Sequence, residues 1–370
     1  MTTTLSRMSP ADVEAFGAEM DAIRAEVLGS LGADDAAYVR RVIALQRRLE
    51  LAGRATLLAS AFPPAWIAGT VALSAAKVLE NMEIGHNVLH GQWDWMRDPA
   101  IHSTTWEWDN VSAAEGWKHS HNDLHHTWTN VVGRDRDVGY TIMRMSEDQR
   151  WHPVHLLQPA FNVVLAAFFQ WGIALYDLEL DELREGRRTW ADIGRNAKRL
   201  VKKASGQVLK DYVVHPLLSG PSFIPTLAAN ATANLVRNLW SNVVIFCGHF
   251  PDGAEMFSVD DIEDETRGGW YVRQLLGSAN IDGGPLMHLM TGNLSFQIEH
   301  HLFPDLPSNR YQEISPRVRE ICERYDLPYT SGPLHTQYLS TWKRVLRLAL
   351  PPKVTAAVPS APVPQRLIAA

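Results

Sequence analysis

Long uncharged stretches alternate with polar segments along this chain. Asp, Glu, Lys and Arg are absent from residues 55–76 and 212–236, which hold 22 and 25 residues, and from the shorter run 238–251. Residues 153–176 form a fourth apolar stretch. A helix needs about 20 mostly apolar residues to cross a bilayer, so the first two stretches are long enough. The alternative is a set of buried helices in a large soluble protein, but the pattern favours a membrane protein.

The polar segments predict how the chain is divided. Residues 1–50 form a cytosolic N-terminal lead-in, amphipathic and helical from residue 11 onward. Residues 51–345 form the membrane domain, whose polar part after residue 252 can build a cap. The segment 351–370 is rich in proline and alanine, and we expect a disordered tail there.

Basic residues orient the membrane segments. Residues 184–203 are rich in lysine and arginine, and the positive-inside rule places such a stretch in the cytoplasm. The arginines near residues 40–48 indicate the same side, so each membrane passage should return. We therefore expect these inserted segments: about 51–82, turning at Pro63-Pro64; 211–229 and 233–250, turning near 229–234; and 153–176, interfacial or re-entrant.

Composition excludes some classes of function. The formal net charge is −6 and the sequence pI is about 6.2, so we expect no nucleic-acid partner. Cys247 and Cys322 are the two cysteines among 370 residues, which is too few for a disulfide framework. The first residues have no apolar core, so they do not read as a secretory signal.

The histidines carry the candidate chemistry, because most of the 15 cluster near the ends of apolar stretches. His86 and His90 are one helical turn apart, so their rings share a face. His121 and His125 repeat this spacing. Such pairs suit a metal, and their number exceeds what one ion needs, so we expect two metals. The glutamate of HExxH and CxxC pairs are missing, which excludes the zinc-protease and structural-zinc patterns. Imidazole suits iron, copper, zinc and nickel alike.

Three boxes resemble those of the integral-membrane fatty-acid desaturases of the QxxHH type, which include linoleoyl-CoA and other acyl-CoA desaturases. The boxes are H86-NVL-H90, H121-NDL-H125-H126 and Q297-IE-H300-H301, and the resemblance covers about residues 60–330. It implies an all-α membrane protein with about four membrane-inserted helices under a cytosolic helical cap. The cap would hold two iron ions at the cytoplasmic face of a bacterial cell membrane. His249 matches a further ligand of related desaturases, and the implied ligands are His86, His90, His121, His125, His126, His249, His300 and His301.

Four other residues are candidates for contacts around the metals. Gln297 stands where other relatives have histidine; it is a weak ligand or a hydrogen-bond partner of a ligand, and we favour the second role. Glu83 lies three residues before His86, where its carboxylate could orient a metal-binding ring. Asn242 could hold a metal-bound water or join two helices. His119 is a spare ligand or a surface residue.

The resemblance implies the reaction. Two electrons and O2 remove two hydrogens from adjacent methylenes of an acyl-CoA or acyl-lipid, which gives a cis double bond and water. Acid–base side chains cannot do this, so the reaction needs a metal cofactor. The haem motif HPGG of a fused electron carrier is missing, which implies a separate ferredoxin-like or flavin-linked reductase. The alternatives are a membrane hydroxylase with the same boxes and a non-catalytic metal-binding membrane protein.

Overall fold

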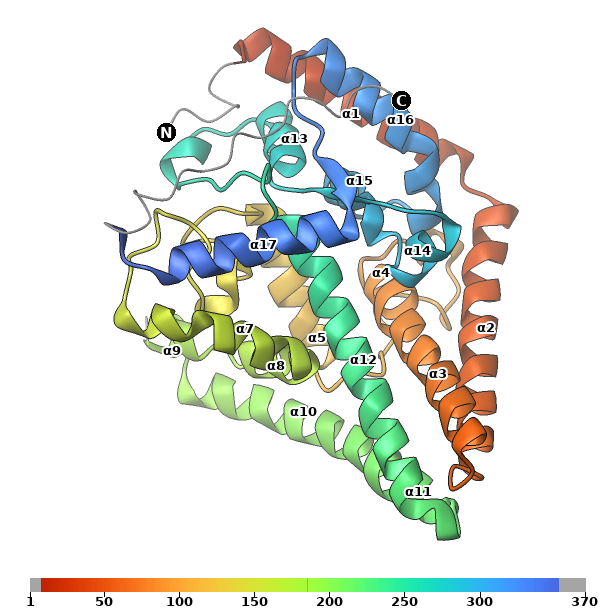
Figure 1. The fold of residues 1–370 in the computed structure, drawn as a ribbon. Coiled ribbons are helices and arrows are strands. Elements are labelled where there is room, and N and C mark those ends of the chain that lie inside the picture. The colour runs from red at the N-terminus through yellow and green to blue at the C-terminus, as the bar shows by residue number, and fades with distance from the viewer. Residues whose placement is uncertain (1–7, 185, 353–370) are drawn as a thin grey trace.

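The computed structural model describes residues 8–184 and 186–352, and within them the fold is helical apart from two three-residue strands (Figure 1). The predicted all-α class is confirmed. Short 3-10 turns join many elements. The longer helices are α1 (Pro10–Ser30), α2 (Ala33–Leu57), α3 (Pro63–Leu79), α10 (Trp190–Val208), α12 (Phe223–His249), α16 (Tyr311–Arg324) and α17 (Leu334–Ala349).

The shorter elements connect these helices and carry much of the polar sequence. They include three π-helical segments, in which the hydrogen bonds reach one residue further than in an α-helix. These are η2 (Glu80–His86), η4 (Lys118–His125) and η7 (Leu209–Val214). The others are α4 (Asn87–Leu89), α5 (Ala114–Trp117), α6 (His126–Trp128), α7 (Gln158–Ala167), α8 (Phe169–Tyr176), α9 (Leu180–Arg184), α11 (His215–Leu218), α13 (Arg267–Leu276), α14 (Pro285–Met290), α15 (Gln297–Leu302), β1 (Asn280–Asp282) and β2 (Ser331–Pro333).

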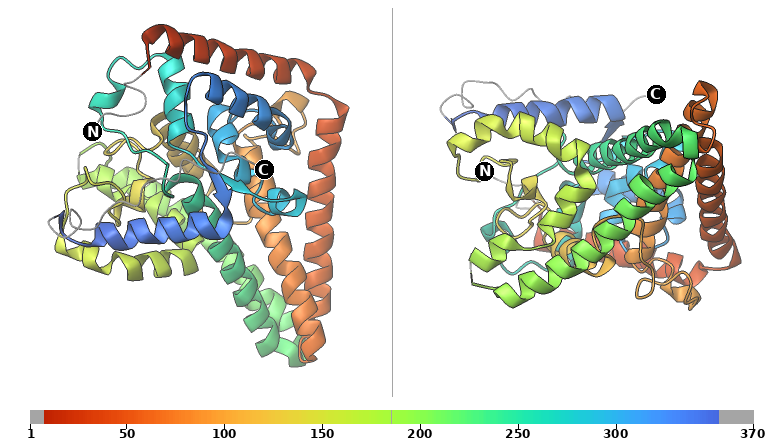
Figure 2. Two further views of the ribbon diagram at one scale, coloured as in Figure 1. Left: turned by 45° about the horizontal axis from the view of Figure 1, so that its top comes forward. Right: turned by 90° about the horizontal axis from the view of Figure 1, so that it is seen from below.

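The first helical hairpin consists of α2 and α3, which lie side by side in all ribbon views (Figures 1 and 2). The chain turns at residues 58–62, and Pro63 begins α3, where its missing N–H costs no hydrogen bond. The turn therefore lies just before the predicted Pro63-Pro64, and both prolines are part of the first turn of α3. The helices approach closely at two glycines: a Cβ atom on Gly69 would lie 2.7 Å from Leu57 Cγ, and one on Gly53 would lie 2.9 Å from Leu73 N.

The second hairpin descends through α10, η7 and α11 and returns through α12. The turn that we predicted near 229–234 is wrong, because α12 runs unbroken from Phe223 to His249. Within α12, proline occurs only in the first turn and glycine only next to the last residue, so nothing in its middle favours a bend. The chain turns instead at residues 219–222, where Gly220 adopts φ 54° and is followed by proline.

Helix length and composition give one membrane-span candidate among the described residues. No single helix there is long and apolar enough to cross a bilayer. The pair Pro153–Ala167 and Phe169–Tyr176 passes this test when taken together, and it is bent by 101°. The bend occurs at Phe168, and it brings Gly172 so close to Leu165 that a Cβ atom there would lie 2.5 Å from Leu165 Cδ1.

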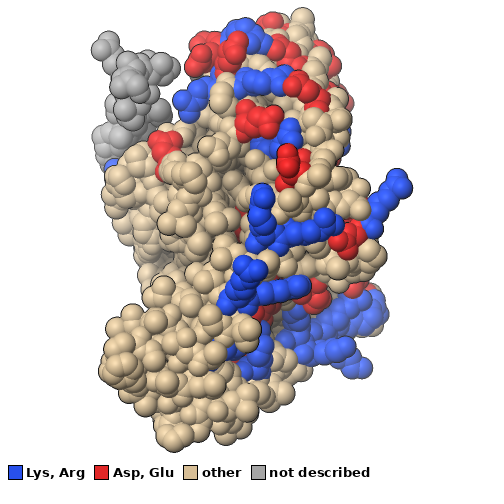
Figure 3. All heavy atoms as spheres, turned by 90° about the vertical axis from the view of Figure 1, so that its right-hand side faces the viewer, with Lys and Arg blue, Asp and Glu red and all other residues tan. Residues whose placement is uncertain are grey.

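The turns of both hairpins meet at one end of the molecule, which we call the apex (residues 58–71 and 214–228). The apex contains no Asp, Glu, Lys or Arg, and in Figure 3 the lower end of the molecule carries neither charge colour. Large apolar side chains are exposed at the apex, whereas a surface in contact with water would carry mainly polar side chains. They are Leu58, Phe62, Ile67, Val71, Leu217, Leu218 and Ile224.

A belt of buried ion pairs joins the two hairpins above the apex. Asp211 is fully buried and lies 2.7 Å from Lys77 Nζ and 2.9 Å from Arg54 Nη2. Asp109 lies 3.2 Å from Lys77 Nζ and 2.7 Å from Lys210 Nζ. The charges that flank the uncharged stretches of the sequence therefore neutralise one another across the hairpins.

The cap lies at the opposite end, where α1 crosses α13 and α16 (Figure 2). Its core includes Phe16, Tyr271, Phe303 and Tyr311. Residue 50, our predicted end of the lead-in, falls inside α2. Apart from residues 351 and 352, the predicted disordered tail lies outside the described residues.

Candidate metal centre

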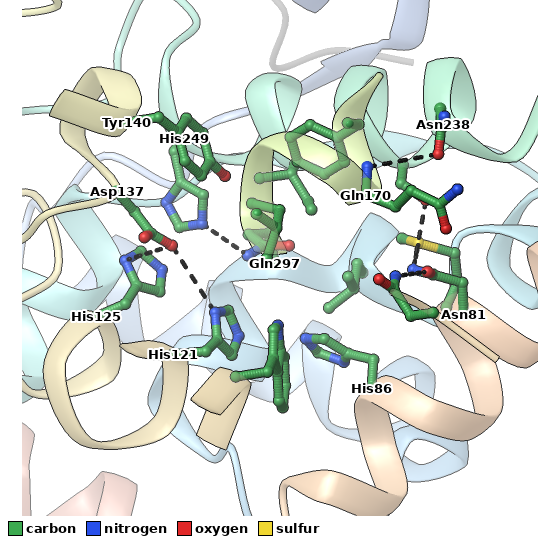
Figure 4. A pocket seen from close by; sticks show the side chains of 18 of the residues that line it. Asn81, His86, His121, His125, Asp137, Tyr140, Gln170, Asn238, His249 and Gln297 are labelled. Atoms are coloured by element: carbon green, nitrogen blue, oxygen red, sulfur yellow. Dashed lines mark hydrogen bonds and ion pairs between the residues drawn. The ribbon is translucent and has the colours of Figure 1, made fainter. Parts of the chain in front are cut away.

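Eight histidines from four separate segments converge between the cap and the upper ends of the hairpins. Figure 4 shows four of them, His86, His121, His125 and His249. They come from η2 and the residue that ends α4, from η4 and α6, from the end of α12, and from α15. The first two boxes each begin within a π-helical segment, although the His90 N–H still bonds to the His86 carbonyl at 3.1 Å, as in a regular α-helical turn. The rings of His86 and His90 still face each other, with centroids 4.6 Å apart.

The histidines form two main groups. In the first group, one ligand atom from each residue lies within 4.8 Å of the others, and its members are His86, His90, His121 and His300. The second group meets the same criterion and consists of His125, His249 and His301. His126 lies between them: its Nε2 is 3.3 Å from His121 Nε2, and its ring stacks on His301 with centroids 4.4 Å apart.

The ring nitrogens have the free positions that metals require. Five of them are buried without a hydrogen-bond partner: Nε2 of His90, His300 and His301, and Nδ1 of His126 and His249. A buried polar atom without a partner is costly, and five in one cluster fit cations better than a packed core. Burial also lowers the pKa of His86 to about 4, which keeps its ring in the neutral form that binds metal. The residues therefore fit two metal ions.

A carboxylate supports the second group. Asp135 Oδ2 lies 3.0 Å from His125 Nδ1, and Asp137 Oδ2 lies 3.8 Å from the same nitrogen. Burial acts to lower the pKa of His125, but these carboxylates raise it overall to about 9. Asp135 was not predicted, although the charged run G133-RDRD follows the second box closely enough to have been a signal.

Neutral groups hold the other rings. Asn87 Oδ1 lies 3.0 Å from His86 Nδ1, and Tyr311 Oη lies 3.3 Å from His300 Nδ1. Gln274 Oε1 accepts from His301 Nδ1 at 2.9 Å, while its amide nitrogen donates to the His126 carbonyl. None of these three residues was predicted. Asn87 lies inside the first box but is not itself a ligand type, and Gln274 lies 27 residues before His301.

Gln297 lies directly beside the second group. Its amide nitrogen is 3.0 Å from His249 Nε2, and its Oε1 is buried without a hydrogen-bond partner. A Cβ atom on Gly248 would lie 2.9 Å from Gln297 Cδ, so this glycine makes room for the amide. The contact agrees with either role that the sequence suggested, ligand or partner of a ligand.

The other three candidates lie differently. Burial raises the pKa of Glu83 to about 7, and its carboxylate accepts hydrogen bonds from Tyr38, Asn293 and Ser308 rather than from a metal-binding ring. Asn242 is buried in α12, and its amide nitrogen has no partner. His119 is 43% exposed, contacts Asp123 and Glu179, and belongs to neither histidine group.

A cavity opens beside both groups (Figure 4). His86, His121, His125, His249 and Gln297 line one wall. Amides lie toward one end, and the rest of the lining is largely apolar and aromatic. The amides at that end include Asn81, Gln170 and Asn238, and the apolar lining includes Trp117, Tyr140, Phe169, Ile173, Ile245 and Phe250. The charged residues Asp135, Asp137 and Arg237 also line the cavity. This lining suits an apolar chain that passes close to the histidines.

Comparison with known proteins identifies the family. Residues 60–333 match the model of the fatty acid desaturase family. The chain belongs to that family. This desaturase is 51% identical, over 94% of its own length and 82% of the relative, to the NADPH-dependent stearoyl-CoA 9-desaturase of Mycobacterium tuberculosis. It is 29% identical to the sn-1 linoleoyl-lipid 6-desaturase of Arthrospira platensis, over 58% of each chain.

A third relative is the acyl-lipid (7-3)-desaturase of Rebecca salina, which is 26% identical over 65% of this chain and 54% of its own. These comparisons confirm the resemblance that the histidine boxes carry. They also confirm the prediction of an enzyme, an oxidoreductase of lipid metabolism that desaturates fatty acyl chains.

Proposed function

We propose that this desaturase introduces a cis double bond between carbons 9 and 10 of a saturated acyl-CoA such as stearoyl-CoA. The single observation that carries the proposal is the pair of histidine groups, with unpartnered ring nitrogens, beside a largely apolar cavity. The proposed substrate and the proposed position of the double bond are those in the name of the Mycobacterium tuberculosis relative. An acyl-lipid is the second candidate substrate, because more distant relatives carry that name.

Two iron ions fit the centre, one in each group, with His126 between them. When bound, iron supplies the O2 chemistry that removes hydrogen from unactivated methylenes. The protein orients the imidazoles through Asn87, Asp135 and Gln274. The cavity keeps water away and aligns one methylene pair with the rings. Gln297 lines this cavity, where it would bind a metal or hydrogen-bond a ligand of one. The buried amide of Asn242 would hold a metal-bound water.

The two electrons come from a separate protein. We propose a ferredoxin-like or flavin-linked reductase that draws them from NADPH, as the name of the 51% identical relative suggests for that enzyme. The reductase would approach the cap from the cytoplasm, since NADPH is a cytoplasmic reductant.

The apex would insert into a bacterial cell membrane from the cytoplasmic side. About four helices then take part: the end of α2, α3, α11 and α12, with the bent pair α7–α8 at the interface. Residues 1–50 would be the lead-in, 51–345 the membrane domain, and 351–370 the tail. The uncharged part of α3, residues 63–76, is 14 residues long, so it reaches about 21 Å into the bilayer. The exposed apolar apex and the belt of ion pairs above it support this arrangement.

Expression of the full chain in a desaturase-deficient host, together with a ferredoxin and its reductase, tests the function. Fatty-acid methyl esters would be profiled and double bonds located by mass spectrometry. We expect a new monoenoic acid with a 9,10 double bond, absent from the His301→Ala variant. A hydroxylated chain would show a hydroxylase instead. Iron-loaded protein that gives no product with active reductase would favour the non-catalytic metal-binding protein.

A further inference from the structure

The two histidine groups differ in the charge of the residues behind them. In the second group, His125 Nδ1 hydrogen-bonds the carboxylate of Asp135 at 3.0 Å. In the first group, the two short contacts to ring Nδ1 atoms come from neutral groups, the amide of Asn87 and the hydroxyl of Tyr311. The nearest carboxylate oxygen to that group's rings is Asp137 Oδ2, 3.9 Å from His121 Nδ1 and beyond hydrogen-bond distance.

Asp135 is held firmly in this position. Its side chain is 1% exposed, Oδ2 accepts the Asn130 backbone N–H at 2.8 Å, and Oδ1 accepts that of Asp137 at 2.9 Å. The side chain of Asn130 in turn donates to the carbonyls of Glu255 and Gly277. The loop after the second box is therefore built around this carboxylate, which keeps its contact with His125 in a fixed geometry.

We propose that the two metal positions are unequal, and that Asp135 is the positioning residue that makes the His125–His249–His301 group bind its ion more tightly. This inference rests on the pair of metals in the proposed function. A carboxylate on Nδ1–H fixes the ring with Nε2 toward the group and makes it a stronger donor. Its negative charge also favours a cation, and more so in a buried site than in water. The number of rings alone would predict the opposite order, because the first group has four histidines and the second has three.

Metal titration of the full-length protein in detergent tests the inference. Metal-free protein would be titrated with Co²⁺ under nitrogen, with the visible absorption of the bound ion as the readout. We expect two steps in the wild type. Asp135→Asn should weaken the tighter step by about 10- to 100-fold, the usual effect of removing such a partner, and leave the weaker step in place. His90→Ala should remove the weaker step and spare the tighter one.

Asn87→Asp is the matched variant for the first group, because it places a carboxylate on His86 Nδ1. It should tighten the weaker step, which structural damage would not do. The inference is overturned by two equal steps in the wild type, by equal weakening of both steps in Asp135→Asn, or by loss of the tighter step in His90→Ala. Unequal steps in a protein that makes no alkene would overturn the proposed function alone, and equal steps in an active desaturase would overturn this inference alone.

Discussion

The histidine centre and the apex are both regions without exposed charged side chains, but they are built in opposite ways. The centre buries many polar atoms and bonds the outer nitrogens of its rings to Asn87, Asp135 and Gln274. The apex has no charged residues and leaves side chains such as Phe62 and Ile67 exposed. Each buried polar atom of the centre therefore needs a hydrogen-bond partner or a metal ion. The exposed apolar side chains of the apex need an apolar environment instead.

The belt of ion pairs lies where these two regions meet. Asp211, on the second hairpin, contacts Arg54 and Lys77 of the first. Charged contacts thus begin at a defined level of the bundle. Below it the two hairpins meet through neutral contacts, such as Ser60 Oγ to Thr226 Oγ1 at 2.8 Å and Trp66 Nε1 to the Pro225 carbonyl at 2.9 Å. The comparison predicts large effects where a charge loses its partner and smaller ones where only packing changes.

Asp211→Asn should have the largest effect on stability. The variant leaves Lys77 with Asp109 and Arg54 with Glu50 as their remaining acidic partners. Breaking a buried ion pair from one side costs about 3–5 kcal/mol, so we expect a loss of up to that size. Denaturant unfolding in detergent micelles measures the loss. Asp98→Asn is the control, because its ion pair with Arg40 is partly exposed, at 54% for Arg40 and 29% for Asp98, and its loss should change stability by at most about 1 kcal/mol. Equal stability of the two variants would show that the belt contributes nothing.

A charge placed at the apex should weaken membrane retention. Lysine at the centre of a membrane helix costs about 2.5–3.5 kcal/mol, so Ile67→Lys should lower the fraction of protein that stays in membranes after an alkaline wash. Leu28→Lys makes the same change on α1 of the cap, at a partly exposed position. We expect no loss of retention there, and an equal loss in both variants would contradict an inserted apex.

Removing the metals should destabilise the centre and spare the apex. A ligand at a hundred times its dissociation constant stabilises the folded state by about 2.7 kcal/mol. A strong chelator should therefore lower the melting temperature of the iron-loaded wild type, but change that of His301→Ala much less. Retention in the membrane should stay the same in both proteins. If the chelator left the melting temperature of the wild type unchanged, that result would argue against a metal centre.

The smallest effect should come from Gly69→Ala. The added methyl group would meet Leu57 at 2.7 Å, and overpacking of this kind costs about 1–3 kcal/mol. Gly29→Ala is the matched control, since nothing lies within 4 Å of the added Cβ atom in α1, and it should be slightly stabilising. Thermal unfolding would compare them, and opposite signs are the expected result.

The sequence predicted the centre better than its supports. The histidines can be recognised by their spacing and order, because a metal site built from imidazoles needs several residues of the same type. Asn87 and Gln274 are chosen by tertiary contacts among many similar polar residues, so no pattern marks them. Only the charged run behind the second box pointed to Asp135. The turn near 229–234 failed for a related reason: the length of the uncharged stretch suggested two passages, whereas Gly220 and Pro221 set the actual turn. We expected the Glu83 carboxylate to orient a metal-binding ring, but it accepts hydrogen bonds from Tyr38, Asn293 and Ser308 instead.

The π-helical segments make the register of the first two boxes fragile to insertions and deletions. Each of η2 and η4 has a wider turn than the helices around it, and such a turn accommodates an extra residue. One residue corresponds to about 100° of rotation in an α-helix. A deletion of one residue from 80–85 would leave the HNVLH motif intact and still turn its rings away from the other boxes. Grafting the motif onto a regular helix would thus transfer the ligands without the orientation of their rings. The extra residue that sets this orientation lies outside the motif.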